Sequence, residues 1–200
     1  MTQEKGRRNN MTKSITIVGV GGQGTLLASR ILGNMLVAEG FDVKVSEVHG
    51  MSQRGGSVVT YVRYGDKVAS PVVEKGEADV ILAFELCEGA RWISALKKGG
   101  TLVVNTQQID PMPVVTGAMS YPEHIQEGLR AKSIDVIEVD ALRYAEEAGS
   151  AKAVNVVMIG ALSKYMEFPE EKWVTAIKST VPERFTQMNL KAFELGRSIK

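Results

Sequence analysis

The sequence of 200 residues contains one cysteine and two histidines, and this scarcity excludes several classes of protein. Cys87 cannot form an intrachain disulfide, and a chain without disulfides is typical of a reducing compartment, so we expect a cytoplasmic protein. Iron–sulfur clusters usually need several cysteines, and the cysteine and histidines form no spaced ligand set. The composition therefore predicts no metal site on this chain.

Long apolar runs and an excess of one charge are also missing. No run approaches the length of a membrane helix, and ITIVGV near the start is too short for a secretory signal. The net charge of +1 provides no overall attraction for nucleic acid or an anionic membrane, so neither is an expected partner. The first residues are polar and partly basic, which predicts a disordered tail over residues 1–13 and a single domain over residues 14–200.

Short β-type runs alternate with amphipathic helical segments in the first two thirds of the chain. Strands are expected near residues 14–20, 41–47, 58–64, 79–84, 101–105 and 134–139. Gly65-Asp66 would turn the strand at 58–64 into another at 68–73, which gives a hairpin. The pattern predicts an α/β fold with a Rossmann-like, open, mostly parallel sheet, an antiparallel hairpin and a helical C-terminal part.

The C-terminal third is expected to be helical. Apolar residues recur at helical spacing over 154–165, and Pro169 before two glutamates is typical of a helix start. A narrower apolar stripe suits packing on the domain or on a partner helix: Phe185, Met188, Ala192, Leu195 and Ile199. Before these helices, residues 106–122 contain three prolines and little periodicity, which predicts a long surface connection of a kind that is often functional or interfacial.

A glycine-rich turn after the first strand is the most informative motif. It fits the G-x-G-x-x-G fingerprint of dinucleotide-binding units, and the helix start behind it offers free N–H groups to an anion. Such a unit needs an acidic residue about twenty residues later, and Glu47 lies near that position but is followed at once by another glycine loop. We favour a turn without a dinucleotide, and a stand-alone nucleotide-binding protein is the alternative. The candidate residues are Gly19, Gly21, Gly22, Gln23 and Gly24.

The second glycine loop reads HGMSQRGG. Its arginine could bind a carboxylate or phosphate as a planar fork, while the alternative is a turn shaped by glycines with an ordinary surface arginine. The candidate residues are His49, Gln53, Arg54, Gly55 and Gly56. We expect no catalytic residue, because Cys87 has no base near it in the sequence, His124 suits a solvated helix position, and no G-x-S-x-G motif is present.

Four segments in order resemble a known family. They are GVGGQGTLLAS, SEVHGMSQRGGSVVTYVRYG, GEADVILAFELCEGAR and AVNVVMIGAL, and the last adds Asn155 to the candidate residues. Together they are similar to the gamma-type subunit of the 2-oxoacid:ferredoxin oxidoreductases. The HGMSQRGG loop is the specific element, and it is most similar to the smaller, beta subunit of indolepyruvate ferredoxin oxidoreductase.

The resemblance implies a non-catalytic subunit of an enzyme that oxidises indolepyruvate or other aryl pyruvates; pyruvate and 2-oxoglutarate remain alternatives. In this family, thiamine diphosphate and iron–sulfur clusters carry the reaction, coenzyme A is a substrate and ferredoxin takes the electrons. The thiamine motif GDG…NN is reduced here to Gly65-Asp66-Lys67. A large catalytic subunit is therefore the implied partner and holds both cofactors, while this chain lines the active or coenzyme A site and contacts ferredoxin only indirectly. When it is isolated, the chain is expected to self-associate through the surface that it would otherwise present to its partner.

Overall fold

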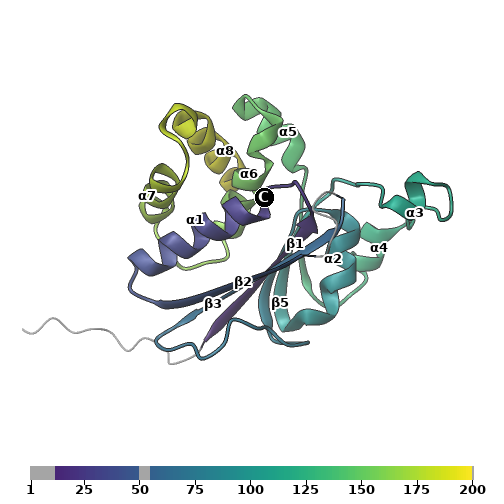
Figure 1. Cartoon of the computed structure of the whole chain (residues 1–200), viewed down its shortest axis with the longest axis horizontal. Coiled ribbons are helices and arrows are strands. Elements are labelled where there is room, and N and C mark those ends of the chain that lie inside the picture. Colours follow the sequence, from purple (N-terminus) through teal and green to yellow (C-terminus); the bar gives the residue numbers. More distant parts are fainter. Residues whose placement is uncertain (1–11, 50–54, 200) are drawn as a thin grey trace, which may run out of the picture.

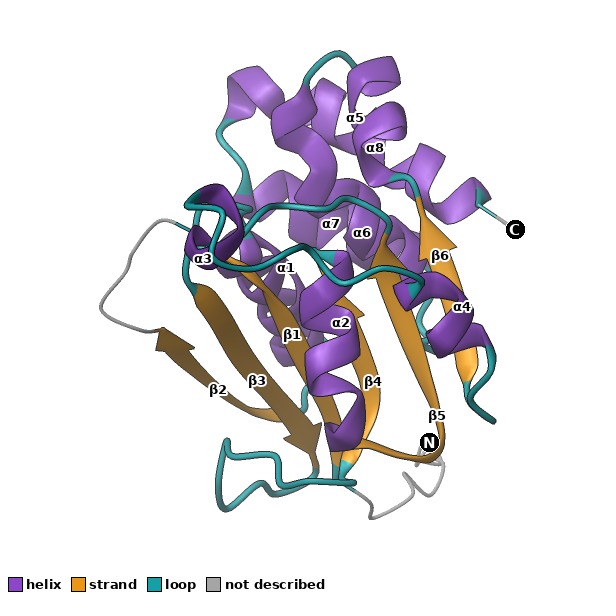
Figure 2. Cartoon of the chain, turned by 90° about the vertical axis from the view of Figure 1, so that its right-hand side faces the viewer, coloured by secondary structure: helices purple, strands orange, loops and turns teal. Residues whose placement is uncertain are grey.

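The computed structural model describes residues 12–49 and 55–199, which form a six-stranded sheet with helices on both faces (Figures 1 and 2). The strand order is β2-β3-β1-β4-β5-β6. Among these described strands, β3 alone runs against its neighbours, and the other five point the same way. The strands are β1 (Lys13–Val20), β2 (Asp42–His49), β3 (Ser57–Gly65), β4 (Ala78–Ala83), β5 (Leu96–Asn105) and β6 (Asp135–Val139). The predicted α/β fold class is confirmed.

The helices divide unevenly between the two faces of the sheet. Helices α1, α5, α6, α7 and α8 share one apolar core with the sheet, whereas α2 and α4 pack on the opposite face (Figure 2). The α-helices are α1 (Thr25–Ala38), α2 (Leu86–Trp92), α3 (Met112–Val115), α4 (Ile125–Arg130), α5 (Ala141–Ala148), α6 (Val154–Ser163), α7 (Glu170–Thr180) and α8 (Thr186–Ser198). Three short 3-10 turns are η1 (Ile93–Ala95), η2 (Ala151–Ala153) and η3 (Glu183–Phe185).

The centre of the larger core is the pair α6 and α8. All ten residues of α6 are buried. A Cβ on Gly160 would lie 2.2 Å from the Phe193 carbonyl oxygen, and one on Gly196 would lie 2.0 Å from the Val157 carbonyl oxygen. Real Cβ atoms do not approach backbone so closely, so the two helices can meet at this spacing only through glycine.

The predicted hairpin between residues 58–64 and 68–73 is wrong. Strand β3 is paired along both edges, because Val62 faces Val45 of β2 on one side and Ile15 of β1 on the other. No edge is left for residues 68–73, where Val68 and Val73 are buried outside any strand. The hairpin is instead formed by β2 and β3, and the HGMSQRGG segment connects them.

The helical C-terminal part forms as expected, with one difference in the last helix. Pro169 directly precedes α7, whose first turn contains two glutamates. In α8 the buried residues are Asn189, Ala192, Phe193 and Gly196, so the buried face is rotated from the predicted stripe, and Phe185 is 42% exposed. Close contact with α6 turns the face with Gly196 inward.

Most of the expected tail at residues 1–13 lies outside the described residues, which begin at residue 12. Strand β1 begins at Lys13, the last residue of that expected tail. Within residues 12–49 and 55–199, none of the helices combines the length and the hydropathy that a membrane span requires.

Candidate functional site

The glycine-rich loop between β1 and α1 lies at the carboxyl ends of β1 and β4, where open α/β sheets place their ligand crevice. The side chain of Gln23 joins these two strand ends. Its Oε1 accepts a hydrogen bond from Val20 N–H at 2.8 Å, and its Nε2 donates to the Phe84 carbonyl at 2.8 Å. A Cβ on Gly19 would lie 2.8 Å from Gln23 Oε1, so glycine at position 19 makes room for this side chain. Gln23 therefore occupies part of the crevice.

The end of the loop is packed against the start of α6. Gly24 has φ of 81°, a left-handed conformation that favours glycine, and a Cβ there would lie 2.5 Å from Asn155 Nδ2. Asn155 is 6% exposed; its Nδ2 donates to the Gly24 carbonyl at 3.5 Å, and its Oδ1 accepts from Val156 N–H at 2.9 Å. The structure thus brings together two predicted site residues that lie 131 positions apart.

The two glycine loops meet at the same edge of the sheet. Gly21 N–H donates to the Gly56 carbonyl at 2.9 Å, and Gly55 N–H donates to the Gly21 carbonyl at 3.5 Å. Gly22, at φ of 102°, has open space around its Cα. Gln53 and Arg54 lie outside the described residues, and for His49 the structure describes only the backbone, which ends β2.

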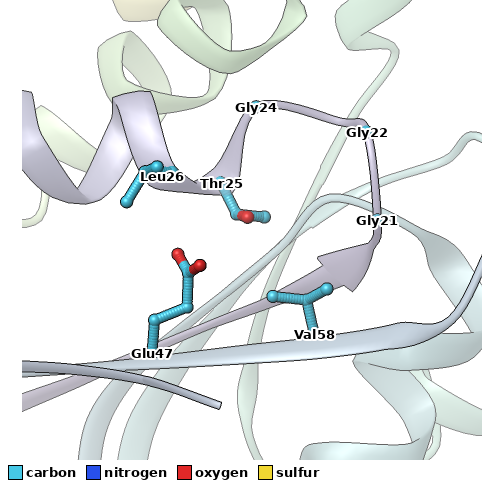
Figure 3. A pocket seen from close by; sticks show the side chains of 7 residues that line it. All are labelled: Gly21, Gly22, Gly24, Thr25, Leu26, Glu47 and Val58. Carbon is cyan, nitrogen blue, oxygen red and sulfur yellow. The ribbon is translucent and has the colours of Figure 1, made fainter. Parts of the chain in front are cut away.

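A cavity of about 370 Å³ opens on one side of the glycine-rich loop (Figure 3). Its lining is Gly21, Gly22, Gly24, Thr25, Leu26, Glu47 and Val58. The exposed Glu47 carboxylate points toward the first turn of α1, as Figure 3 shows. A carboxylate is favourable beside the positive end of a helix, and its charge repels an anion that enters the same cavity. This cavity consequently disfavours a second anion.

A larger cavity, of about 480 Å³, opens on the other side of the same loop. Its lining is Gly22, Gln23, Gly24, Gln107, Leu142, Ala151, Lys152, Val154 and Asn155. The exposed Lys152 brings a positive charge, and both α1 and α6 begin beside the cavity. Amide side chains and two positive helix ends are arranged around a space that suits an anion.

Buried polar residues that sequence analysis missed support this edge. Asn105 is fully buried: its Nδ2 donates to the Phe84 carbonyl at 3.0 Å, and its Oδ1 accepts from Ala141 N–H at 3.2 Å. It therefore ties the end of β4 to α5. Gln107 Oε1 accepts from Gln23 Nε2 at 3.4 Å, which links this network to the glycine-rich loop. An asparagine after a run of valines was the available signal, but its partners are distant in sequence.

A second buried group on this edge is the carboxylate of Glu85, which is 1% exposed. It accepts hydrogen bonds from Glu88 N–H at 2.8 Å, Ile109 N–H at 3.2 Å and the Tyr121 hydroxyl at 2.5 Å. Burial and the bond to Glu85 raise the pKa of Tyr121 well above its usual range, so the hydroxyl stays protonated and donates. Burial, with the charge of Glu85, also raises the pKa of Cys87, which disfavours a reactive thiolate.

The buried carboxylates among the described residues are held by donors within the chain. The buried carboxylate of Glu85 is saturated by donors, and Glu88, 6% exposed, is bonded by the Ser57 hydroxyl at 2.5 Å and by Arg91 at 3.0 Å. His124 lies apart at the start of α4, 72% exposed and 2.6 Å from Glu127. Within residues 12–49 and 55–199, no group of three or more His, Cys, Asp or Glu could hold a metal ion.

Comparisons with known proteins agree with this picture. The model of the pyruvate ferredoxin/flavodoxin oxidoreductase family matches residues 14–199. Indolepyruvate oxidoreductase subunit IorB of Thermococcus kodakarensis is 44% identical over 92% of this chain and 93% of its own length. 2-Oxoglutarate synthase subunit KorC of Methanothermobacter thermautotrophicus is 31% identical, covering 94% of each chain. These matches confirm the resemblance found in the sequence.

A solved structure supports the fold. The gamma subunit of a keto/oxoacid ferredoxin oxidoreductase from Geobacter sulfurreducens superposes with a TM-score of 0.69 at 24% identity, covering 92% of this chain and 95% of that one.

Proposed function

This chain belongs to the pyruvate ferredoxin/flavodoxin oxidoreductase family, and we propose that it is the small, non-catalytic subunit of an indolepyruvate:ferredoxin oxidoreductase. The proposal rests on the 44% identity to an indolepyruvate oxidoreductase subunit over nearly the full length of both chains. Identity to a 2-oxoglutarate synthase subunit is lower, at 31%, which favours an aryl pyruvate over 2-oxoglutarate as the substrate.

The catalytic partner is a large subunit that holds thiamine diphosphate and the iron–sulfur clusters and passes electrons to ferredoxin. The family resemblance supports this division. The single cysteine and the hydrogen-bonded carboxylate of Glu85 fit a subunit that positions ligands and completes an assembly. The cytoplasm is the compartment that this cysteine content favours.

Coenzyme A is the ligand that the larger cavity suits. Its anionic phosphates would lie beside Lys152 and the beginnings of α1 and α6, with the amides of Gln107 and Asn155 as further partners. The smaller cavity is the poorer place for phosphate, because the Glu47 carboxylate faces it. Arg54 remains a sequence-based candidate for the same ligand or for the catalytic subunit.

A stand-alone nucleotide-binding protein is the second candidate function, and one observation favours it. Glu47 shares a cavity with Gly21 and Gly24, as the acidic residue of a dinucleotide fingerprint would. The Gln23 side chain opposes it, because it already joins the ends of β1 and β4 in the crevice. Titrating the chain with NAD(H), NADP(H) and FAD separates the two functions: micromolar binding that is lost in Glu47→Gln would favour the second.

Reconstitution with the catalytic subunit tests the first function. The large subunit, this chain and their mixture are assayed with ferredoxin, coenzyme A and each of indolepyruvate, pyruvate and 2-oxoglutarate. We expect full turnover only in the mixture, with the highest kcat/KM for indolepyruvate. Turnover by this chain alone, or a mixture no better than the large subunit, would contradict the proposal.

The coenzyme A site has a separate test in Lys152→Gln. We expect KM for coenzyme A to rise about tenfold, equivalent to about 1.4 kcal/mol, while KM for indolepyruvate is unchanged. Lys98→Gln is the matched control, because Lys98 is also exposed but lies on β5 near the opposite edge of the sheet. Equal KM values for coenzyme A in both variants would remove Lys152 from the site.

A further inference from the structure

The long connection between β5 and α4 ends in an exposed apolar tip. Residues 110–120, here called the docking loop, contain α3 and three large apolar side chains with high exposure: Met112 at 64%, Val115 at 64% and Met119 at 66%. No residue of α3 is buried. Figure 1 shows α3 standing away from the sheet, at the end toward which β1 points. Single exposed apolar residues are ordinary, but three in eight residues form a patch that indicates an interaction surface.

The docking loop keeps its shape through its own hydrogen bonds. Thr116 N–H donates to the Met112 carbonyl at 2.9 Å, and Met119 N–H donates to the Pro113 carbonyl at 3.0 Å. Gly117, at φ of 75°, ends the helical turn in the left-handed conformation. These bonds shape the backbone of the loop, while its apolar side chains stay exposed.

The buried carboxylate of Glu85 holds both ends of the docking loop. The same oxygen, Oε1, accepts from Ile109 N–H before the loop and from the Tyr121 hydroxyl after it. Closed ends and internal bonds are the features of a compact Ω-loop, a kind that is frequently functional. A buried carboxylate is costly unless its hydrogen bonds are satisfied, so Glu85 is stable here because the loop closes on it.

The docking loop rises from the same edge as the candidate site. Leu86 N–H donates to the Gln107 carbonyl at 3.0 Å, and the Gln107 side chain contacts Gln23 of the glycine-rich loop. Gln107 therefore links the base of the docking loop to the glycine-rich loop of the candidate site.

We propose that the docking loop anchors this chain to the large catalytic subunit by inserting Met112, Val115 and Met119 into an apolar groove with a basic rim. This inference rests on the proposed function and names the surface by which it is achieved. Methionine adapts to irregular grooves and is enriched in interfaces. A basic rim is favoured by two exposed carboxylates, Asp110 at the start of the loop and Glu123 three residues after its end.

A second copy of this chain fits the docking loop less well. In a two-fold contact the same patch meets itself, so the two acidic rims would face each other. Residues 106–124 contain no lysine or arginine, and their one histidine, His124, lies 3.9 Å from Glu123 and leaves Asp110 without a cation in this segment. The charge of the loop therefore favours a different chain as the occupant.

The test measures binding of the full chain to the purified catalytic subunit. The triple variant Met112→Gln, Val115→Thr, Met119→Gln is expected to raise Kd at least tenfold, or about 1.4 kcal/mol, while its Tm stays that of the wild type. Val37→Thr with Val72→Thr is the matched control, because these side chains are 60% and 51% exposed elsewhere, and wild-type Kd is expected.

The outcomes separate the inference from the proposed function. If the triple variant binds the catalytic subunit with the Kd of the wild type, the docking loop is not the anchor, and the proposed function is unaffected. No binding of the wild-type chain to the catalytic subunit would overturn both. Sedimentation supplies the third outcome: a homodimer lost in the triple variant, with Kd for the catalytic subunit unchanged, would assign the loop to a second copy and overturn the inference.

Discussion

Helices α6 and α3 are built from similar apolar residues, VNVVMIGALS and MPVV, yet all ten residues of α6 are buried and none of α3 is. The difference lies in what surrounds each segment. Helix α6 lies between the sheet and α8, so this chain covers it on both sides. Helix α3 belongs to a loop whose two ends are held by Glu85, it stands away from the sheet in Figure 1, and none of its residues is buried. An apolar sequence thus indicates that the side chains of a segment favour burial. The position of the segment in the fold decides whether they are buried within this chain or are available to a partner.

The largest effect is expected where α6 meets α8. Gly160→Ala or Gly196→Ala would place a methyl group 2.2 or 2.0 Å from a backbone oxygen, so the helices must separate. We expect the free energy of unfolding to fall by about 3 kcal/mol, measured by urea unfolding. Gly128→Ala in α4 is the control, since a Cβ there has open space, and no loss of stability is expected. A tolerated alanine at Gly160 would show that the two helices are not in close contact.

The next effect concerns an aromatic cluster at the end of the sheet where β1 begins, opposite the glycine-rich loop. Tyr64 packs against Phe41 and Phe168, with ring centroids 5.3 and 6.4 Å apart. Burial, helped by the charges of Asp79 and Glu167, raises the pKa of Tyr64 to about 12. Because the unfolded tyrosine ionises near pH 10, the stability from this difference is present below pH 10 and is lost as the pH rises toward 12.

We therefore expect the free energy of unfolding of the wild type to fall by about 2 kcal/mol more than that of Tyr64→Phe between pH 10 and pH 12. Urea unfolding across this range measures it, and lysines that titrate there affect both proteins equally. Parallel curves for the two proteins would mean that Tyr64 ionises as freely when folded as when unfolded.

A smaller loss is expected at the base of the docking loop. Tyr121→Phe removes one of three donors to the buried Glu85 carboxylate and leaves Cys87 N–H without its 3.1 Å acceptor. We expect the free energy of unfolding to fall by about 1.5 kcal/mol and proteolysis within residues 110–120 to become faster. Tyr165→Phe serves as the control because Tyr165 is 38% exposed. Equal proteolysis in the two variants would show that Glu85 does not hold the loop.

Sequence patterns were sufficient for the fold class and for the approximate positions of the six strands, because both depend on local periodicity. They failed where the outcome depends on distant pairing. Residues 68–73 have a strand-like composition, but β1 had already taken the free edge of β3. Helical spacing placed Leu195 on the buried stripe of α8, whereas the contact with α6 selected Phe193 and Gly196.

In the candidate site, too, features that depend on local sequence were predicted, and features that depend on distant segments were not. Glycine spacing and family resemblance identified Gly21, Gly24, Gly56 and Asn155, and the structure brings these residues together. The bonds of Gln23 to Val20 and Phe84 and the network around Glu85 could not be predicted, because a polar residue has no periodic signal. Their partners are defined only once β1, β4 and β5 lie side by side.

The smallest effect is expected at the apolar tip itself. The triple variant Met112→Gln, Val115→Thr, Met119→Gln should change the free energy of unfolding by less than about 0.5 kcal/mol. These side chains are already mostly in water, and the backbone bonds of the loop do not depend on them. Met158→Gln in α6 is the contrasting variant, because Met158 is fully buried and its replacement places an amide in the core. We expect it to cost about 3 kcal/mol. Equal losses in the two variants would mean that α3 is covered by this chain after all, and the contrast with α6 would fail.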